Sequence, residues 1–271
     1  MSDASGRFVD VPGGFLHCRT QGQGPDVVLC NPGGADLRVW DSTLSWLAEI
    51  ARVTTFDYRD TGLSSPGTEP YSELDDIAAV MDAAGIVSAV LVGVSDGARR
   101  ALGFGQRYPD RVRRVVASGG TFGDFPDPSP AEVAARQEMR DHFARRAQAR
   151  ASGGAYAEAA LDIDTWAPAL DTYHRRRMIG LTVANDYLVT LADDDYLGRE
   201  LEPPVKTRFR EITVPVSVLV GGHDLAGTRL WAQRIADEIP AATLTVIAGA
   251  DHFPMLSTPD QFERFLRDTL A

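Results

Sequence analysis

Residues 89–98, Ala-Val-Leu-Val-Gly-Val-Ser-Asp-Gly-Ala, decide which fold this sequence predicts. The first four are apolar and favour a strand, and a helical pattern with apolar positions about 3.6 residues apart follows from Gly97. The pentapeptide from Gly93 to Gly97 has the form G-x-S-x-G, whose glycines leave room for a tight strand-to-helix turn. Such a turn exposes the hydroxyl of its central serine. We therefore predict that Ser95 is a nucleophile; the alternative is a glycine-rich turn that only links a strand to a helix.

Short runs that favour strands recur on both sides of this segment, with helical patterns between them. Most runs are continuous Val, Leu and Ile, which is typical of strands buried on both faces of a parallel sheet. The alternation predicts right-handed βαβ units in a doubly wound α/β fold, with an antiparallel hairpin formed by the first two strands. The predicted strands are residues 8–11, 15–20, 26–30, 52–58, 89–94, 112–118, 214–221 and 243–247, and the predicted helices include residues 72–84, 97–107, 228–239 and 259–270.

The alternation breaks once, between about residues 122 and 211, where only helical patterns occur. Ser129-Pro130-Ala131-Glu132 predicts a helix start, because Ser129 can cap the helix, Pro130 suits its first position and Glu132 can close a capping box. The strand pattern resumes at Val214. We therefore expect a core made of residues 1–121 and 212–271 and a helical insertion made of residues 122–211, in one compact unit.

The composition limits the kinds of molecule that this protein is expected to bind. The 271 residues carry a formal net charge of −11, which argues against binding nucleic acid or an anionic membrane surface. No apolar run approaches the roughly 18 residues of a membrane span, and the first residues do not resemble a secretion signal. Cys18 and Cys30 are expected to be buried apolar residues, and no cluster of metal ligands occurs. We expect a cytoplasmic monomer or homodimer that binds a small molecule and needs no metal or cofactor.

A serine nucleophile needs a histidine as its base and a carboxylate that orients this histidine. Among the five histidines, His252 follows the last predicted strand, so its loop lies at the carboxyl edge of the sheet, within reach of Ser95. Asp224 also follows a strand, although a helix cap or a turn is its ordinary role. Asp251 and Asp124 compete for the role of the acid. We favour Asp224, since the acid and then the histidine follow a G-x-S-x-G serine along the chain.

The oxyanion that forms during acyl transfer needs two backbone N–H donors. One is expected from Asp96, directly after the serine. The other is expected from the loop Asn31-Pro32-Gly33-Gly34, which follows the strand 26–30. Because proline has no N–H, Gly33 is the preferred donor and Gly34 the reserve.

Large side chains in the insertion are candidates for a mostly apolar substrate pocket, although their helical spacing also fits packing on the core. The run Asp193-Asp194-Asp195 is expected to be a solvated turn and not a cation site. The pocket candidates are Trp166, Tyr173, Met178, Tyr187 and Leu188.

Together these features resemble the α/β-hydrolase superfamily over essentially the whole chain, from Val27 to the terminal helix. Asp57-Tyr58-Arg59-Asp60-Thr61-Gly62-Leu63-Ser64 is similar to the D-x-R-G-x-G-x-S segment of that family, and Val220-Gly-Gly-His-Asp224 with His252 is similar to its acid and histidine loops. The resemblance implies a mostly parallel eight-stranded sheet with helices on both faces, and it identifies the insertion as a helical cap. The chain looks most like small bacterial enol-lactonases, haloperoxidase-like esterases and biphenyl-hydrolase-like enzymes.

The sequence departs from the family pattern at two places. Asn31-Pro32 stands where the family usually has His-Gly, which alters the loop expected to donate to the oxyanion. Asp96 lies inside the serine turn, as in some hydrolases of amino-acid esters. Its carboxylate is therefore expected either to attract an ammonium group of the substrate or to point toward solvent or the helix start.

The resemblance and the candidate residues predict a serine hydrolase that cleaves an ester, thioester or lactone of a small molecule through an acyl-Ser95 intermediate. Two alternatives stay open. One is a cofactor-free lyase or isomerase that uses His252 as a base, and the other is a receptor-like member of the same fold that only binds its ligand. Chemistry with an aspartate nucleophile, as in dehalogenases and epoxide hydrolases, is disfavoured by the serine at position 95.

Overall fold

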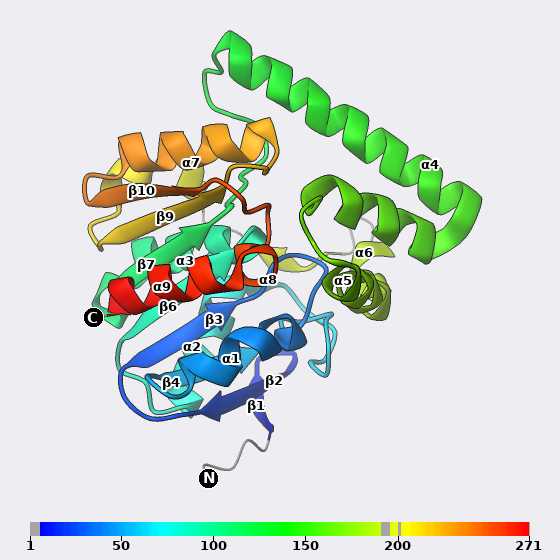
Figure 1. Cartoon of the computed structure of the whole chain (residues 1–271). Helices are drawn as coiled ribbons and strands as arrows, with labels where there is room; N and C mark the ends of the chain where they lie inside the picture. The colour runs from blue at the N-terminus through cyan, green and yellow to red at the C-terminus, as the bar shows by residue number, and fades with distance from the viewer. Residues whose placement is uncertain (1–5, 191–195, 200–201, 271) are drawn as a thin grey trace.

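A computed structural model describes residues 6–190, 196–199 and 202–270, with the side chains of residues 189 and 190 left out. Eight strands form one sheet in the order β1-β2-β4-β3-β6-β7-β9-β10 (Figure 1). From β4 to β10 all neighbours are parallel, and β2 runs antiparallel to both β1 and β4. The predicted mostly parallel eight-stranded α/β fold is therefore confirmed. The strands are β1 (Arg7–Val11), β2 (Gly14–Gln21), β3 (Asp26–Cys30), β4 (Arg52–Phe56), β6 (Ala89–Val94), β7 (Val112–Ser118), β9 (Val216–Gly221) and β10 (Ala242–Ile247).

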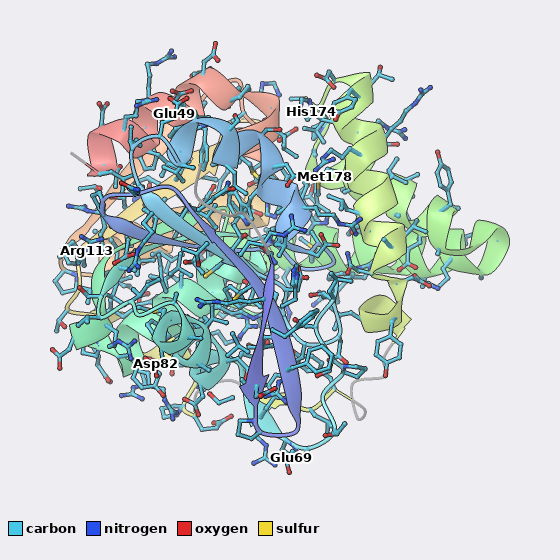
Figure 2. All side chains as sticks on the ribbon, turned by 90° about the horizontal axis from the view of Figure 1, so that it is seen from below. Glu49, Glu69, Asp82, Arg113, His174 and Met178 are labelled. Atoms are coloured by element: carbon cyan, nitrogen blue, oxygen red, sulfur yellow. The ribbon has the colours of Figure 1, made fainter. Side chains whose placement is uncertain are left out.

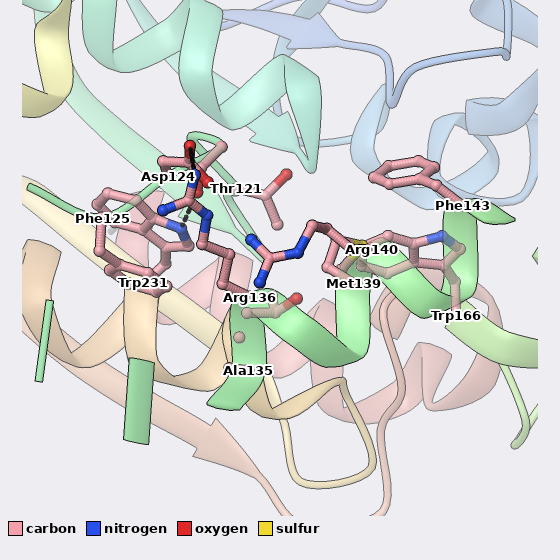
Figure 3. A pocket seen from close by; sticks show the side chains of 13 residues that line it. Thr121, Asp124, Phe125, Ala135, Arg136, Met139, Arg140, Phe143, Trp166 and Trp231 are labelled. Carbon is pink, nitrogen blue, oxygen red and sulfur yellow. Dashed lines mark hydrogen bonds and ion pairs between the residues drawn. The ribbon is translucent and has the colours of Figure 1, made fainter. Parts of the chain in front are cut away.

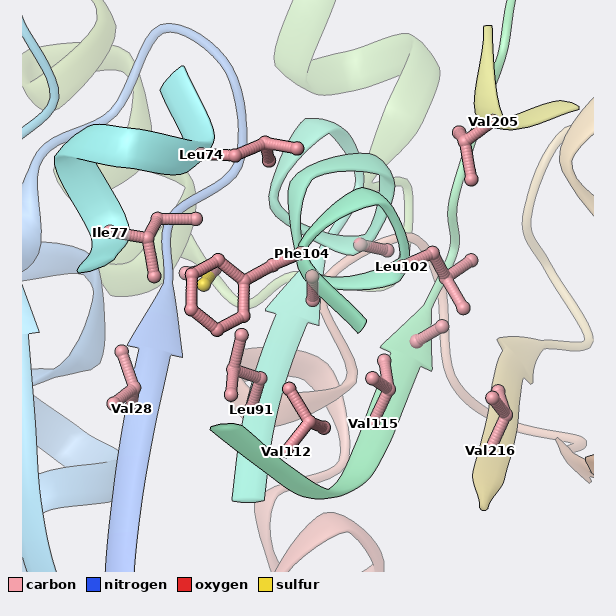
Figure 4. Close-up of a cluster of buried hydrophobic side chains, with 14 of the residues drawn as sticks. Val28, Leu74, Ile77, Leu91, Leu102, Phe104, Val112, Val115, Val205 and Val216 are labelled. Carbon is pink, nitrogen blue, oxygen red and sulfur yellow. The ribbon is translucent and has the colours of Figure 1, made fainter. Parts of the chain in front are cut away.

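Helices cover both faces of the sheet. All residues of β6 and β9 are buried, as expected for strands that are apolar on both sides. On one face, Phe104 packs between Ile77 of a neighbouring helix and Leu91 of the sheet (Figure 4). This face carries α2 (Glu73–Ala83), α3 (Asp96–Arg107) and α7 (Ala226–Glu238); the other carries α1 (Asp41–Leu47), α8 (Pro254–Ser257) and α9 (Pro259–Leu270).

The strand register brings five loops to the carboxyl edge of the sheet. Cys30 pairs with Gly93, Val94 with Ser118, Ser118 with Leu219, and Ile247 with Gly221. The loops that follow β3, β6, β7, β9 and β10 therefore start side by side. This is the edge at which ligands bind in open parallel sheets.

The insertion between β7 and β9 is mainly helical. It contains α4 (Pro130–Trp166), α5 (Thr172–Ala184), α6 (Asp186–Thr190) and two short 3-10 turns at Val205–Thr207 and Phe209–Glu211. The predicted capping box is present at the start of α4, where Glu132 N donates to Ser129 Oγ at 3.4 Å and Ser129 N donates to Glu132 Oε2 at 2.8 Å. Gly154 has φ 69° and ψ −165°, which bends α4 so that its second arm turns back against α5 (Figure 1).

One element of the insertion departs from the expectation of helices alone. The two-residue strand β8 (Gly198–Arg199) pairs in parallel with β5 (Tyr71–Ser72) of the core. A pair this short leaves no periodic pattern in the sequence. The run Asp193-Asp194-Asp195 lies outside the described residues.

Asn185, at the carboxyl end of α5, joins the insertion to the core. Its Oδ1 accepts from Gly62 N at 2.8 Å, and its Nδ2 donates to Asp36 Oδ2 at 2.9 Å. Figure 2 shows Met178 of α5 where the insertion meets the core, while charged side chains such as Glu49 and Arg113 surround the outside of the core. Across the part of the chain that the structure describes, no helix is long and apolar enough to span a membrane.

Candidate active site

Ser95 occupies a strained turn between β6 and α3. Its φ of 56° and ψ of −119° lie outside the regions that residues with a side chain usually adopt, and such strain is typical of functional sites. The turn also requires both flanking glycines. A Cβ at Gly93 would lie 2.2 Å from Gly97 O, and a Cβ at Gly97 would lie 2.2 Å from Cys30 O. The backbone of the G-x-S-x-G segment therefore has the tight geometry that the pattern predicts.

His252 and Asp224 form a buried pair at the same edge of the sheet. His252 Nδ1 lies 3.1 Å from Asp224 Oδ1 and 3.0 Å from Oδ2, and both residues are less than 5% exposed. Since a carboxylate only accepts, Nδ1 carries the proton and Nε2 is left free to act as a base. The imidazole is also held by α4, because its ring centroid lies 4.4 Å from that of Trp166 and His252 N donates to Trp166 O at 3.2 Å.

The other two candidate acids have different partners. Asp251 Oδ2 accepts from Ala169 N at 3.0 Å and its Oδ1 accepts from Phe253 N at 3.0 Å, so it ties the histidine loop to the insertion. Asp124 pairs with Arg136 at the surface. Among the three, Asp224 is the one that the structure brings to His252.

Ser95 and His252 line one cavity of about 310 Å³ beneath the insertion, which we call the catalytic cavity. Within the described residues Ser95 Oγ makes no hydrogen bond to the imidazole. The remaining lining residues are Pro32, Gly33, Gly34, Phe143, Arg146, Asp162, Ile163, Trp166, Met178, Thr182, Leu188 and Phe253.

The two predicted oxyanion donors lie next to each other. A Cβ at Gly33 would lie 3.6 Å from Asp96 Cβ, and neither backbone N–H donates a hydrogen bond to another described residue. Asn31 takes no part in lining the cavity. Its buried amide donates to Phe56 O at 2.8 Å and accepts from Trp40 Nε1 at 2.9 Å, so it anchors the loop in the core. Asn31, which stands where the family usually has histidine, therefore changes how the loop is anchored. The backbone N–H groups of the loop stay available to donate to a substrate.

The Asp96 carboxylate belongs to an ion-pair network at the start of α3. It accepts from Arg99 Nε at 2.7 Å and pairs with Arg100, and both arginines also pair with the buried Glu73. Burial alone would raise the pKa of Asp96, but the charges of Arg100 and Arg99 outweigh it and lower the pKa to about 2. Because this carboxylate already pairs with two arginines of α3, recognition of an ammonium group is not supported.

The pocket prediction is corrected for two residues. Trp166, Met178 and Leu188 line the catalytic cavity, whereas Tyr173 and Tyr187 are 66% and 55% exposed and lie outside its lining. Arg146 and Asp162 form a polar wall of the cavity that was not predicted from the sequence. The pair Gly153-Gly154 could have indicated this wall, because glycines inside a helical pattern mark a break. The break decides which face of α4 turns to the site.

The segment similar to D-x-R-G-x-G-x-S has a structural role. Asp57 is buried and accepts from His17 Nδ1 at 2.8 Å and from Leu37 N at 2.9 Å. Arg59 forms a buried two-point ion pair with Asp76, with both distances 2.8 Å. Asp57 thus ties the segment to the chain that follows the loop of residues 31–34, and Arg59 ties it to α2.

Comparisons with known proteins identify the family of this chain. The model of the alpha/beta hydrolase family matches residues 27–265. A pimeloyl-[acyl-carrier protein] methyl ester esterase of Chromobacterium violaceum is 29% identical over 94% of this chain and 98% of its own. A zearalenone hydrolase of Bionectria ochroleuca is 26% identical over 96% of each chain.

Among solved structures, the enol-lactonase of Burkholderia xenovorans LB400 superposes with a TM-score of 0.72 at 24% identity, covering 97% of this chain and 99% of its own. This likeness concerns the fold. With the family model matched over most of its length, the chain belongs to the alpha/beta hydrolase family.

Proposed function

We propose that this protein is a serine hydrolase that cleaves a carboxylic ester, thioester or lactone of a small molecule through an acyl-Ser95 intermediate. The observation that carries the proposal is the strained Ser95 in the lining of a cavity that it shares with His252, whose Nδ1 contacts Asp224. A relative named as a methyl ester esterase supports the choice of an ester bond. A cavity of about 310 Å³ suits a small substrate.

The first half of the reaction forms the acyl enzyme. His252 Nε2 takes the proton of Ser95 Oγ, and Oγ attacks the carbonyl carbon of the substrate. The carbonyl oxygen becomes an oxyanion that accepts from the N–H groups of Gly33 and Asp96. The imidazolium, stabilised by Asp224, then donates its proton to the leaving oxygen or sulfur as the bond to the carbonyl carbon breaks.

The second half releases the product. A water molecule gives a proton to His252 and attacks the acyl carbon, and the same donors hold the second oxyanion. When this intermediate collapses, the imidazolium returns a proton to Ser95 Oγ and the carboxylic acid leaves.

The start of α3 adds an electrostatic contribution to these steps. The N-terminus of a helix carries a partial positive charge that favours an anion beside the N–H of Asp96. The nearby Asp96 carboxylate would oppose that effect, but its ion pairs with Arg99 and Arg100 offset its charge. The network therefore permits an aspartate directly after the nucleophile without repulsion of the oxyanion.

Labelling by a fluorophosphonate tests the activated serine. We expect the intact mass to show one adduct that maps to Ser95, no adduct in Ser95→Ala and strongly slowed labelling in His252→Ala. Ser45→Ala, which removes an exposed serine of α1, is the control and should label like the parent protein. A panel of p-nitrophenyl esters, thioesters and lactones then measures turnover.

Two results would redirect the proposal. Full activity of Ser95→Ala on the eventual substrate would favour a lyase or isomerase with His252 as its base. If the parent protein is neither labelled nor active on any ester while a control hydrolase is, the serine hydrolase proposal is wrong and ligand binding without turnover becomes the better hypothesis.

A further inference from the structure

A second cavity of about 240 Å³ adjoins the catalytic cavity beneath the first arm of α4 (Figure 3). Phe143 and Trp166 line both cavities, so these two side chains form the boundary between them. At the opposite end of the second cavity, Phe125 and Trp231 stack with their ring centroids 4.0 Å apart. We call it the arginine cavity; its other lining residues are Thr121, Gly123, Asp124, Ala135, Arg136, Met139, Arg140, Gly227 and Thr228.

The arginine cavity carries more positive than negative charge. Asp124 pairs with Arg136, which neutralises that arginine. Arg140 donates to Gln137 Oε1 from Nε at 3.2 Å and from Nη2 at 2.6 Å, and glutamine is neutral. The nearby Asp141 accepts from Gln137 Nε2 at 2.7 Å, and within the described residues no carboxylate lies in ion-pair distance of Arg140.

The guanidinium of Arg140 projects into the middle of the cavity, between Arg136 and the Phe143–Trp166 boundary (Figure 3). Its planar group of N–H donors can bind the two oxygens of a carboxylate, as it can those of a phosphate. Other described arginines, such as Arg113 and Arg145, also have no carboxylate partner, but Arg140, although an exposed residue, lines a cavity that adjoins the catalytic cavity. The charge at this place favours an anion that reaches the cavity from the catalytic side.

We propose that the arginine cavity binds a carboxylate at the far end of the substrate and that Arg140 is a specificity-determining residue. The substrate class is then an ester, thioester or lactone with a carboxylate several bonds from the scissile carbonyl. The side chains of Phe143 and Trp166 at the boundary and of Met139 would contact the carbon chain between the two groups. This inference rests on the proposed function, because it places the scissile carbonyl at Ser95.

Two esters that differ by one group test the proposal. Mono-4-nitrophenyl adipate carries a carboxylate where 4-nitrophenyl hexanoate carries a methyl group, and the reacting ester is otherwise the same. We expect kcat/KM to be higher for the adipate ester, and we expect this preference to fall about 10-fold in Arg140→Gln while the hexanoate rate stays constant. The preference should also shrink in high salt. Arg145→Gln is the matched control, since Arg145 is an exposed residue of α4 outside both cavities.

The possible failures are distinguishable. If both esters are cleaved but the parent shows no preference, or if Arg140→Gln keeps it, the inference is wrong and the proposed function stands. If neither ester is cleaved and Ser95 is not labelled, the proposed function fails. Calorimetric titration of Ser95→Ala protein with monomethyl adipate and methyl hexanoate then still decides the inference: weaker adipate binding after Arg140→Gln supports it, and unchanged or absent binding overturns it.

Discussion

At the residue scale, the contact between His252 Nδ1 and Asp224 gives the carboxylate a role that asparagine cannot fill. In Asp224→Asn the side-chain amide can donate to Nδ1, so the imidazole proton moves to Nε2. Nε2 can then no longer accept the proton of Ser95. We expect kcat for an ester to fall about 10³- to 10⁴-fold with little change in the unfolding midpoint. Asp124→Asn, at the surface, should change kcat less than threefold. A comparable loss in Asp124→Asn, or none in Asp224→Asn, would contradict this assignment.

The ion pairs of Asp96 predict how acid affects stability. Because Arg100 and Arg99 outweigh burial and lower its pKa from 3.8 to about 2, this group contributes stability that is fully present above its unfolded pKa and is lost as the pH falls toward 2. We expect the free energy of unfolding of the parent protein to decline between about pH 4 and pH 2 more steeply than that of Asp96→Asn. Denaturant titrations across this range measure both curves, and parallel curves would count against the network.

At the element scale, the bend of α4 depends on one glycine. A residue with a side chain is strained at the φ of 69° and ψ of −165° of Gly154, although its added Cβ would meet no atom within 4 Å. We therefore expect Gly154→Ala to lower the free energy of unfolding by about 1–3 kcal/mol through backbone strain alone. Activity should fall too, because the bend places both arms of α4 over the catalytic cavity.

Gly180→Ala is the matched control for that substitution. Gly180 lies in the interior of α5, has no positive φ, and would also place its Cβ in open space. Alanine favours the helix over glycine, so this variant should gain up to about 1 kcal/mol in urea denaturation. Equal effects at the two positions would show that strain at Gly154 does not matter.

At the scale of the whole molecule, Asn185 couples the insertion to the core through Gly62 and Asp36. Asn185→Leu leaves both groups without this partner in a buried place and should cost about 1–3 kcal/mol. Asn185→Asp keeps an acceptor for Gly62 N but sets a carboxylate against Asp36, so we expect it to be at least as damaging. Hydrogen exchange of α5 amides should quicken in both variants, and unchanged exchange would refute the coupling.

The sequence alone was sufficient to predict most of the strands and helices. The predicted strands 26–30, 89–94 and 112–118 coincide with β3, β6 and β7, and the capping box at Ser129 starts α4 as predicted. These features follow from local periodicity, capping groups and glycine geometry, which act between residues close in the chain. The turn at Ser95 belongs to the same class, because its flanking glycines alone allow the backbone to cross so closely.

Contacts between segments that are distant in the sequence could be found only from the tertiary structure. We favoured Asp224 by chain order, but Asp124 and Asp251 also lie between Ser95 and His252, so this order does not choose among the three. Only the packed loops bring Asp224 to His252, 28 residues away. Local pattern likewise could not tell that Tyr173 is exposed while Arg140 faces a cavity, since that depends on how α4 bends and docks on the core. Periodicity, capping groups and glycine geometry therefore determined the elements and the turn at Ser95. The contact of Asp224 with His252, the pocket walls and their charge were decided by packing, which sets the distances between side chains far apart in sequence.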